Sequence, residues 1–509
     1  MTMAVLEIER KYDVDSGAVL PDLAGMPGVA RTGQAAVHEL VAHYLDTQDL
    51  RLRAAGVTLR HRAGGEDGGW HLKLPLGEDR EELRVAGEDP TAPVPPELQA
   101  LVRAIARDQP LVPVAQLITR RTVRQLLDDA GSVLAEVVDD DVQGAVPGAP
   151  EDATTRWREW EVELGSGDRE LLDVVERRLL EAGAERSGSP SKVGRVLAGR
   201  AAEPGVPAWW SGPTGRAGTS GQVVQAHLRA QVDELVARDP QVRRDLPDAV
   251  HKMRVATRRL RSALRTFRPL LDRTTADPIR DELRWLAGVL GEARDVEVMH
   301  ARLRELIASQ PEELVMGPVL SRVDLVIGGR YRHAHERVVG ELDGPRYLRL
   351  LEALEALATA PPFQDRARGP AREVLAPLVR RTWTRLDKTM RAAERATGEE
   401  QDLLLHEARK QAKAVRYAAE SVEPAFGRRA VRFARAVERL QEVLGEHQDG
   451  VVTREALREL GAASSKSGEN GFTFGRLHGL EESRAAAAGA GWPQIRAEVS
   501  APKLRRWLD

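Results

Sequence analysis

Polar and apolar residues alternate with a period of two through the first 198 residues, and turn residues divide the alternation into segments. We predict eight strands there, at Val5–Val14, His38–Thr47, Thr58–Arg62, Gly69–Leu76, Glu81–Val85, Leu117–Leu127, Ser132–Val142 and Trp157–Leu164. Most are joined by Gly-, Asp- or Pro-containing turns, as in an antiparallel sheet that closes on itself. An amphipathic helix is expected at Asp168–Ala182.

A change of pattern follows this region. From Gly199 to Gly221 the chain is rich in Gly, Pro, Ser and Ala around Trp209-Trp210, which is typical of an interdomain linker. Beyond it the apolar period becomes 3.6 and remains so to about Leu508. The expected organisation is therefore a β domain over residues 1–198, a linker over 199–220 and an all-α domain over 221–509.

The helical half contains an internal repeat. The sequence His251-x-x-Arg254-x-x-x-Arg258-x-x-Arg261 recurs as His406-x-x-Arg409-x-x-x-Lys413-x-x-Arg416. These offsets fall on one helix face, so each copy presents a His and three cations as a stripe about 15 Å long. Each copy is also followed by a similar segment, which is Leu290–Asp295 in the first and Leu444–Asp449 in the second. We predict two pseudo-symmetric four-helix bundles, at about 221–345 and 370–509.

Charged residues of both signs occupy alternate positions in almost every predicted strand of the first domain. In the first strand, for example, Glu7, Glu9 and Lys11 share one face. For a single strand, a solvated face is the simpler interpretation. Eight such strands in series favour a polar lumen, in which Lys and Arg bind phosphate oxygens and Asp and Glu hold divalent cations.

Two acidic positions leave alternatives open. Asp139, Asp140 and Asp141 are consecutive, and we choose Asp140 as the inward residue because it shares a face with Glu136. Glu82 lies in an unusually acidic stretch and is either a lumen residue or a surface charge.

Composition narrows the class of protein. The chain has no cysteine, which excludes disulfides and thiolate metal sites and suits a reducing cytosol. No signal peptide or long apolar segment is evident, so we expect a cytoplasmic protein with no membrane partner. The net charge of −3 hides local segregation, and the Arg-, Ala-, Leu- and Gly-rich composition is typical of bacteria with GC-rich genomes.

The repeated helix is unusually basic. The segment from His251 to Arg268, both included, has seven Lys or Arg and no Asp or Glu. A solvated face normally interleaves both signs, whereas unmatched cations repel one another, so an anion-binding face is favoured. Nucleic acid is the weaker candidate because no aromatic residues are interleaved to stack on bases.

The first domain resembles the CYTH family of triphosphate tunnel metalloenzymes. The resemblance covers about residues 3–198 and rests on Glu7-x-Glu9-x-Lys11, Arg60-x-Arg62, Lys73, Arg121, Glu161-x-Glu163 and Ser191-Lys192. It implies an eight-stranded antiparallel tunnel that hydrolyses a triphosphate with Mg²⁺ or Mn²⁺. The implied metal ligands are Glu7, Glu9, Glu161 and Glu163 with an acid of the seventh strand, taken as Asp140. The implied phosphate-binding residues are Lys11, Arg60, Arg62, Lys73, Arg121 and Lys192.

Further candidates join these sets. Arg84 of the fifth strand is a candidate for substrate binding, and Lys11 and Glu136 are the candidate catalytic residues. A glutamate close to the metal would serve as general base for the attack of water on the terminal phosphoryl group.

The second domain resembles the CHAD family over about residues 219–509. The resemblance implies two four-helix bundles with a basic groove that binds inorganic polyphosphate and an association with polyphosphate granules. The residues implied to line the groove are His251, Arg254, Arg258, Arg261, His406, Arg409, Lys413 and Arg416. Asp295 and Asp449 are expected to orient His or Arg rather than to touch a polyanion.

Together these patterns predict a metal-dependent triphosphatase fused to a polyphosphate-binding module, with inorganic triphosphate as the favoured substrate. The alternatives are an adenylate cyclase or a nucleoside or thiamine triphosphatase of the same family. A further alternative is a non-catalytic polyphosphate-binding protein, against which the many lumen carboxylates argue. The oligomeric state is left open.

Overall fold

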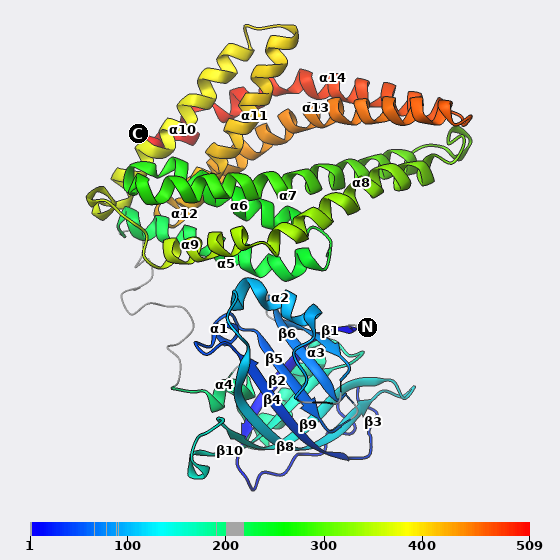
Figure 1. Ribbon diagram of the computed structural model, residues 1–509, viewed down its shortest axis with the longest axis vertical. Helices are drawn as coiled ribbons and strands as arrows, with labels where there is room; N and C mark the ends of the chain where they lie inside the picture. The colour runs from blue at the N-terminus through cyan, green and yellow to red at the C-terminus, as the bar shows by residue number, and fades with distance from the viewer. Residues whose placement is uncertain are drawn as a thin grey trace. The chain divides into compact units, whose positions relative to one another are not determined.

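A computed structural model of the chain describes residues 3–65, 67–77, 79–87, 89, 91–189, 191–199 and 218–509, without the side chains of 3, 151, 446–449 and 485–491. The chain forms two compact units, Met1–Val206 and Pro207–Asp509 (Figure 1). Most of the predicted linker, including Trp209-Trp210, lies outside the described residues, so its assignment stays a prediction.

The first unit is an antiparallel sheet that curls on itself. Strands β1 (Met3–Glu7) and β2 (Glu9–Val14) form one N-terminal segment, which pairs with β7 through β1 and with β10 through β2. Between those two partners the sheet runs in the order β7 (Asp79–Val85), β6 (Gly69–Leu76), β5 (Thr58–Ala63), β4 (Ala36–Asp46), β8 (Val112–Leu127), β9 (Val133–Ala145) and β10 (Thr155–Leu164). The N-terminal segment therefore joins the two ends of the sheet.

The predicted strands are all present, and the first is divided. The break falls at Ile8, whose carbonyl accepts a hydrogen bond from Leu164 N at 2.9 Å where the segment changes partner. The predicted helix is α3 (Arg169–Glu181), and the Asp168 side chain caps it by accepting from Leu171 N. The pattern missed the 11-residue helix α2 (Pro96–Ala106) and four shorter elements: β3 (Arg31–Thr32), β11 (Glu185–Arg186), α1 (Arg51–Ala54) and α4 (Lys192–Val196).

One hydrophobic core of this unit lies between the sheet and α3. In β10, the side chains of Trp160 and Val162 are fully buried there against Val175 and Leu179. Because successive residues of a strand point to opposite faces, the glutamates that alternate with them point to the other side of the sheet. The core thus fixes which face of β10 carries charge.

The second unit consists of two four-helix repeats, which confirms the predicted fold class. The first is α5 (Ser220–Arg243), α6 (Ala249–Thr266), α7 (Arg273–Ala308) and α8 (Val319–Leu342), followed by α9 (Pro345–Thr359). The second is α10 (Ala371–Ala393), α11 (Gly398–Ser421), α13 (Arg428–Lys466) and α14 (Phe472–Val499), with the short α12 (Glu423–Phe426) and α15 (Pro502–Arg505).

The repeats contact each other in several places, including the middle of the unit and the far ends of its long helices. Helices α6 and α11, which carry the two His–Arg stripes, pack against each other (Figure 1). At the far ends of the long helices, Leu303 and Ile327 of the first repeat share a hydrophobic cluster with Leu457 and Phe474 of the second.

We expect Trp160→Ala to destabilise the first unit by about 3–5 kcal/mol, because it removes a fully buried ring from between the sheet and α3. Denaturant unfolding followed by circular dichroism would measure this, with the transition of each unit fitted separately. The control is Val37→Ala, whose side chain is 53% exposed and whose effect should stay within about 0.5 kcal/mol. An equal effect of both variants would contradict this assignment of the core.

Candidate functional site

The inner face of the curled sheet encloses a cavity of about 650 Å³. Twelve of the predicted residues line it: Glu7, Glu9, Lys11, Arg60, Arg62, Lys73, Arg84, Arg121, Glu136, Glu161, Glu163 and Lys192. Asp140 is completely buried behind this lining and contacts Arg121 and Lys192. Its neighbours lie elsewhere, since Asp139 binds Arg158 and Asp141 is exposed.

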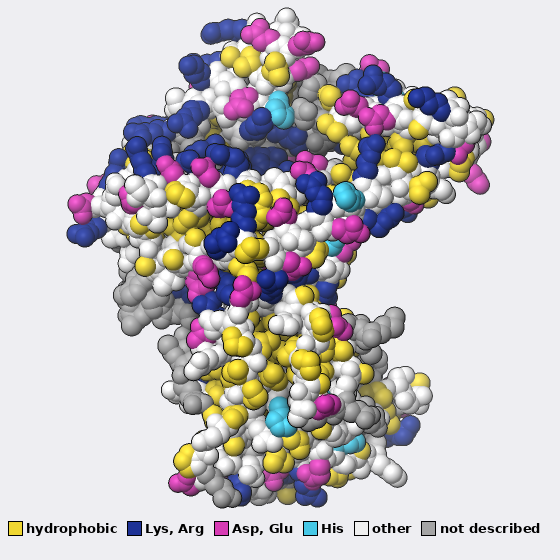
Figure 2. Space-filling model, viewed as in Figure 1, with side chains coloured by type: hydrophobic (Ala, Val, Ile, Leu, Met, Phe, Trp, Pro, Cys, Tyr) yellow, Lys and Arg dark blue, Asp and Glu magenta, His cyan; other side chains and the backbone are white. Residues whose placement is uncertain are grey.

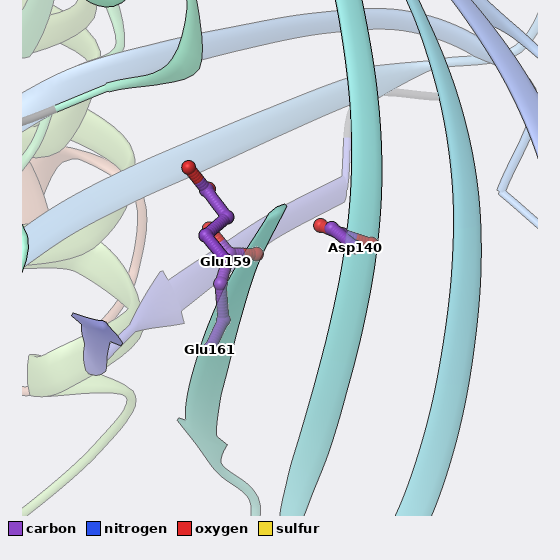
Figure 3. Close-up of side chains that lie close together, drawn as sticks. All are labelled: Asp140, Glu159 and Glu161. Atoms are coloured by element: carbon purple, nitrogen blue, oxygen red, sulfur yellow. The ribbon is translucent and has the colours of Figure 1, made fainter. Parts of the chain in front are cut away.

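Three buried carboxylates meet at one wall. Asp140 of β9 points towards Glu159 and Glu161 of β10, with ligand atoms within 4.8 Å of one another (Figure 3). The Lys192 ammonium lies 2.9, 2.7 and 2.7 Å from Asp140, Glu159 and Glu161, respectively. Lys192 reaches them as the first residue of α4, whose N-cap Ser191 accepts a hydrogen bond from Gly194 N at 3.1 Å.

Further cations neutralise this cluster. Arg121 donates two hydrogen bonds to Asp140, at 2.9 and 2.6 Å, and one to Glu161 at 2.9 Å. Burial alone would raise the pKa of Glu161, but the ammonium groups of Lys11 and Lys192 hold it well below its usual range. Burial would likewise lower the pKa of Lys192, yet Asp140 and Glu161 raise it. Glu161 and Lys192 are therefore both charged at neutral pH.

A second carboxylate group is less well neutralised. Lys73 donates to Glu7 Oε1 at 2.6 Å, while the buried Glu7 Oε2 accepts no hydrogen bond from any described residue. Burial raises the pKa of Glu163, and the neighbouring carboxylate of Glu7 raises it further. A buried oxygen without a donor, among carboxylates that repel one another, fits a divalent cation, which prefers such oxygen ligands.

Arginines occupy another part of the cavity. Arg60 donates to the Tyr44 hydroxyl at 3.2 Å, and Arg62 contacts Asp67. Burial and the nearby Arg60 guanidinium lower the pKa of Arg62 to about 9. Arg60 and Arg121 thus repel the charged form of Arg62, and an anionic ligand would relieve that repulsion.

The structure places three glutamates whose positions the sequence pattern left open or did not predict. Glu82 is a cavity residue, completely buried, and it accepts a hydrogen bond from Arg84 Nε at 2.6 Å. Glu136 is half-buried and accepts from Gln125 at 3.1 Å, apart from the Lys192 cluster. Glu159 was not among the predicted ligands, although its parity with Glu161 and Glu163 was a signal that would have included it.

In the helical unit, the two stripes come together. His251, Arg254 and Arg258 lie on α6 with Arg261, and His406, Arg409, Lys413 and Arg416 lie on α11. Burial lowers the pKa of Arg258, and cations of its own stripe and Arg409 of the other lower it further. Figure 2 shows Lys and Arg side chains gathered along a hollowed band of this unit.

In each repeat, an arginine of the basic stripe packs against a glycine of the next long helix. A Cβ atom at Gly291 would lie 3.5 Å from Arg254 Nη2, and one at Gly445 would lie 3.3 Å from Arg409 Nη2. The sequence repeat thus preserves an arginine packed on a glycine of the neighbouring helix. Arg254 Nη1 also lies 3.2 Å from Asp295, whereas the side chain of Asp449 lies outside the described residues.

Comparisons with known proteins agree with both halves of this description. The CYTH domain model matches residues 6–196 and the CHAD domain model matches residues 226–458. The chain belongs to the family of proteins that join a CYTH domain to a CHAD domain. CYTH proteins are metal-dependent triphosphate hydrolases or cyclases, and CHAD is a polyphosphate-binding domain.

An uncharacterized protein of Mycobacterium tuberculosis (strain H37Rv) is 39% identical over 498 residues, which are 94% of this chain and 93% of that protein. Among solved structures, PptA from Streptomyces chartreusis matches 55% of this chain and 99% of its own, with 20% identity and a TM-score of 0.46. The CHAD domain from the plant Ricinus communis matches 56% of this chain and 93% of its own, with 23% identity and a TM-score of 0.44. No helix among the described residues is long and apolar enough to cross a membrane.

We expect Glu163→Gln to stabilise the metal-free first unit at pH 7. The pKa of Glu163 is raised in the fold, so its carboxylate destabilises the folded state above that pKa and has no such effect where it is protonated in both states. A relief of about 1 kcal/mol would raise the melting temperature by roughly 2–4 °C. The gain should shrink as the pH falls through the raised pKa.

Thermal unfolding in chelator across pH 4–8 would measure this, with the exposed Glu185→Gln as the charge-matched control. A lower melting temperature of Glu163→Gln at pH 7, or a gain independent of pH, would contradict the proposed crowding of carboxylates.

Proposed function

We propose that the first unit hydrolyses a triphosphate with Mg²⁺ or Mn²⁺, and that inorganic triphosphate is its substrate. The observation that carries this proposal is the cavity itself, in which carboxylates and cations from strands all around the sheet converge. Phosphoryl transfer requires positioning and neutralisation of charge more than covalent chemistry, and both kinds of group are present.

Each set of residues has a separate role in this proposal. Glu7, Glu9, Glu161 and Glu163 with Asp140 would hold the metal, which when bound supplies Lewis acidity at the phosphoryl group and an activated water. Lys11, Arg60, Arg62, Lys73, Arg84, Arg121 and Lys192 would bind phosphate oxygens. Glu136 would accept the proton of the attacking water as general base, with Lys11 close to the reacting phosphoryl group.

Binding of substrate would exchange ion pairs within the cavity. Lys73 and Lys192 now contact carboxylates, at 2.6–2.9 Å. A triphosphate that took over these ammonium groups would leave the carboxylates to a divalent cation. Metal and triphosphate would therefore assist each other's binding. The triphosphate would take the ammonium groups away from the carboxylates, and the metal would take the carboxylates away from the ammonium groups.

The first test is phosphate release from inorganic triphosphate with Mg²⁺ or Mn²⁺. Glu7→Gln together with Glu9→Gln should reduce the rate by roughly 10²-fold or more, because it removes two of the proposed metal ligands. The matched control is Glu97→Gln with Glu185→Gln, which has the same change of charge at exposed positions and should retain activity.

The same assay distinguishes the alternatives. Cyclic AMP formed from ATP would displace the hydrolase proposal, and faster turnover of a nucleoside or thiamine triphosphate would replace the substrate. If the wild type releases phosphate from no triphosphate but binds polyphosphate tightly, the protein is a non-catalytic polyphosphate-binding protein.

We also propose that the basic face of α6 and α11 binds inorganic polyphosphate. Neutralising Arg258 and Arg409 together (to Gln) should weaken binding by about 10-fold or more at moderate salt and reduce its salt dependence. Titration of a fluorescent polyphosphate at several salt concentrations would measure both effects. Displacement of polyphosphate by single- or double-stranded DNA at matched charge and salt would overturn the preference for polyphosphate.

A further inference from the structure

The two basic helices carry the same stripe but opposite charges beside its last cation. That cation is Arg261 in α6 and Arg416 in α11. Four residues after it the first copy has Arg265 and the second has Glu420. On the next long helix, seven residues before the repeated glycine, the first copy has Arg284 and the second Glu438. Two equivalent positions thus differ by a reversal of charge.

In the second repeat, these carboxylates engage the end of the stripe. Arg416 donates from Nε to Glu420 at 2.8 Å, and its Nη1 lies 2.9 Å from Glu438. Glu420 also accepts from Arg259 of α6 at 2.8 Å. The positive charge of Arg416 is therefore matched within the protein, and a polyanion would have to compete with two carboxylates for it.

In the first repeat, the equivalent place is crowded with arginines. Arg261 is half-buried near Arg265, Arg280 and Arg284, and burial together with these neighbours lowers its pKa. Among the described residues, no carboxylate counts among the groups that shift the pKa of Arg261, and Glu407 is the one that does so for Arg265. The carboxylate of Asp281 lies 3.6 Å from Arg280 and 3.2 Å from Arg284.

Other groups do not cancel this concentration of charge. Asp277 is shared between Arg280, at 3.1 Å, and Arg268, at 2.5 Å. Across the repeat boundary, both Arg385 of α10 and Glu407 of α11 act on Arg265. Held so close together, these cations repel one another, and a bound polyanion would remove that repulsion as well as gain contacts.

We infer that the polyphosphate groove is one-sided: the phosphate chain binds most strongly at the arginine cluster of Arg261, Arg265, Arg280 and Arg284, and the equivalent end at Arg416 is neutralised by the protein's own carboxylates. This inference rests on the proposed binding of polyphosphate to the helical unit. It assigns Arg265, Arg280 and Arg284, which lie outside the repeated motif, to the binding surface.

The test compares two single-charge variants of the full chain. Arg265→Gln should weaken binding of inorganic polyphosphate by about tenfold and reduce the slope of log affinity against log salt by about 0.7. Arg368→Gln, at a position 88% exposed in the same unit, changes the net charge equally and should alter affinity less than twofold. Circular dichroism establishes that both variants are folded.

The reciprocal variant tests the neutralised end. Glu420→Gln with Glu438→Gln releases Arg416 from its carboxylates and should tighten binding about threefold or more. Its control is Glu312→Gln with Glu313→Gln, an exposed pair of equal charge in the same unit, which should have little effect.

The outcomes separate the two proposals. If wild type binds polyphosphate but Arg265→Gln loses no more affinity than Arg368→Gln, the one-sided groove is wrong while polyphosphate binding stands. If removing Glu420 and Glu438 weakens binding, those carboxylates support the site and the inference is likewise wrong. If the wild-type chain does not bind polyphosphate at all, the function proposed for the helical unit is wrong too.

Discussion

The pairing of inward-pointing charges is the constraint on which the first unit depends. The core between the sheet and α3 fixes the orientation of β10 through Trp160 and Val162, and this turns the alternating glutamates towards the inside of the curl. Buried charges are stable only when they are paired, hydrated or bound to a ligand. Every neighbouring strand must therefore supply a counter-charge, as Arg121 of β8 does for Asp140 of β9. The same requirement makes the cavity suitable for a ligand that carries both metal and phosphate charges.

The helical unit arranges its charges differently from the first unit. Its cations lie along helices rather than around a closed wall, and those of the repeated motif are half-buried. Such a surface suits a polymer of repeating charge, which needs no end groups and gains from many weak contacts. The enclosed cavity suits a short anion that must be held in a fixed position for reaction. The helical surface is thus suited to a long polyanion, and the cavity of the first unit is suited to a short one.

Much of the fold could be predicted from sequence because the signals were periodic. The strands follow from alternation, and the two helical bundles follow from the repeated His–Arg spacing. Short elements such as α4 escaped because five residues are too few to show a period, although α4 places Lys192 against three carboxylates. Face assignment by parity worked within β9, where Asp140 is buried and Asp141 exposed. Parity places Glu159 on the same face as Glu161 and Glu163, but it does not show which carboxylates lie close together, because that depends on the curvature and register of the sheet; Glu159 was therefore not predicted as a partner of Asp140 and Glu161.

The break at Ile8 ties the assembly of the site to the last closure of the sheet. Glu7 lies on the part of the N-terminal segment that pairs with β7, and Glu9 lies on the part that pairs with β10, opposite Glu163. Two of the carboxylates thus come together with the others only when both pairings have formed, across a long stretch of chain. Transient opening of this one segment would dismantle the carboxylate group, whereas the pairings from β7 through β10 do not involve it. A bound cation would stabilise the paired state of this segment, and its effect would appear as slower exchange of the amide hydrogens of β1 and β2.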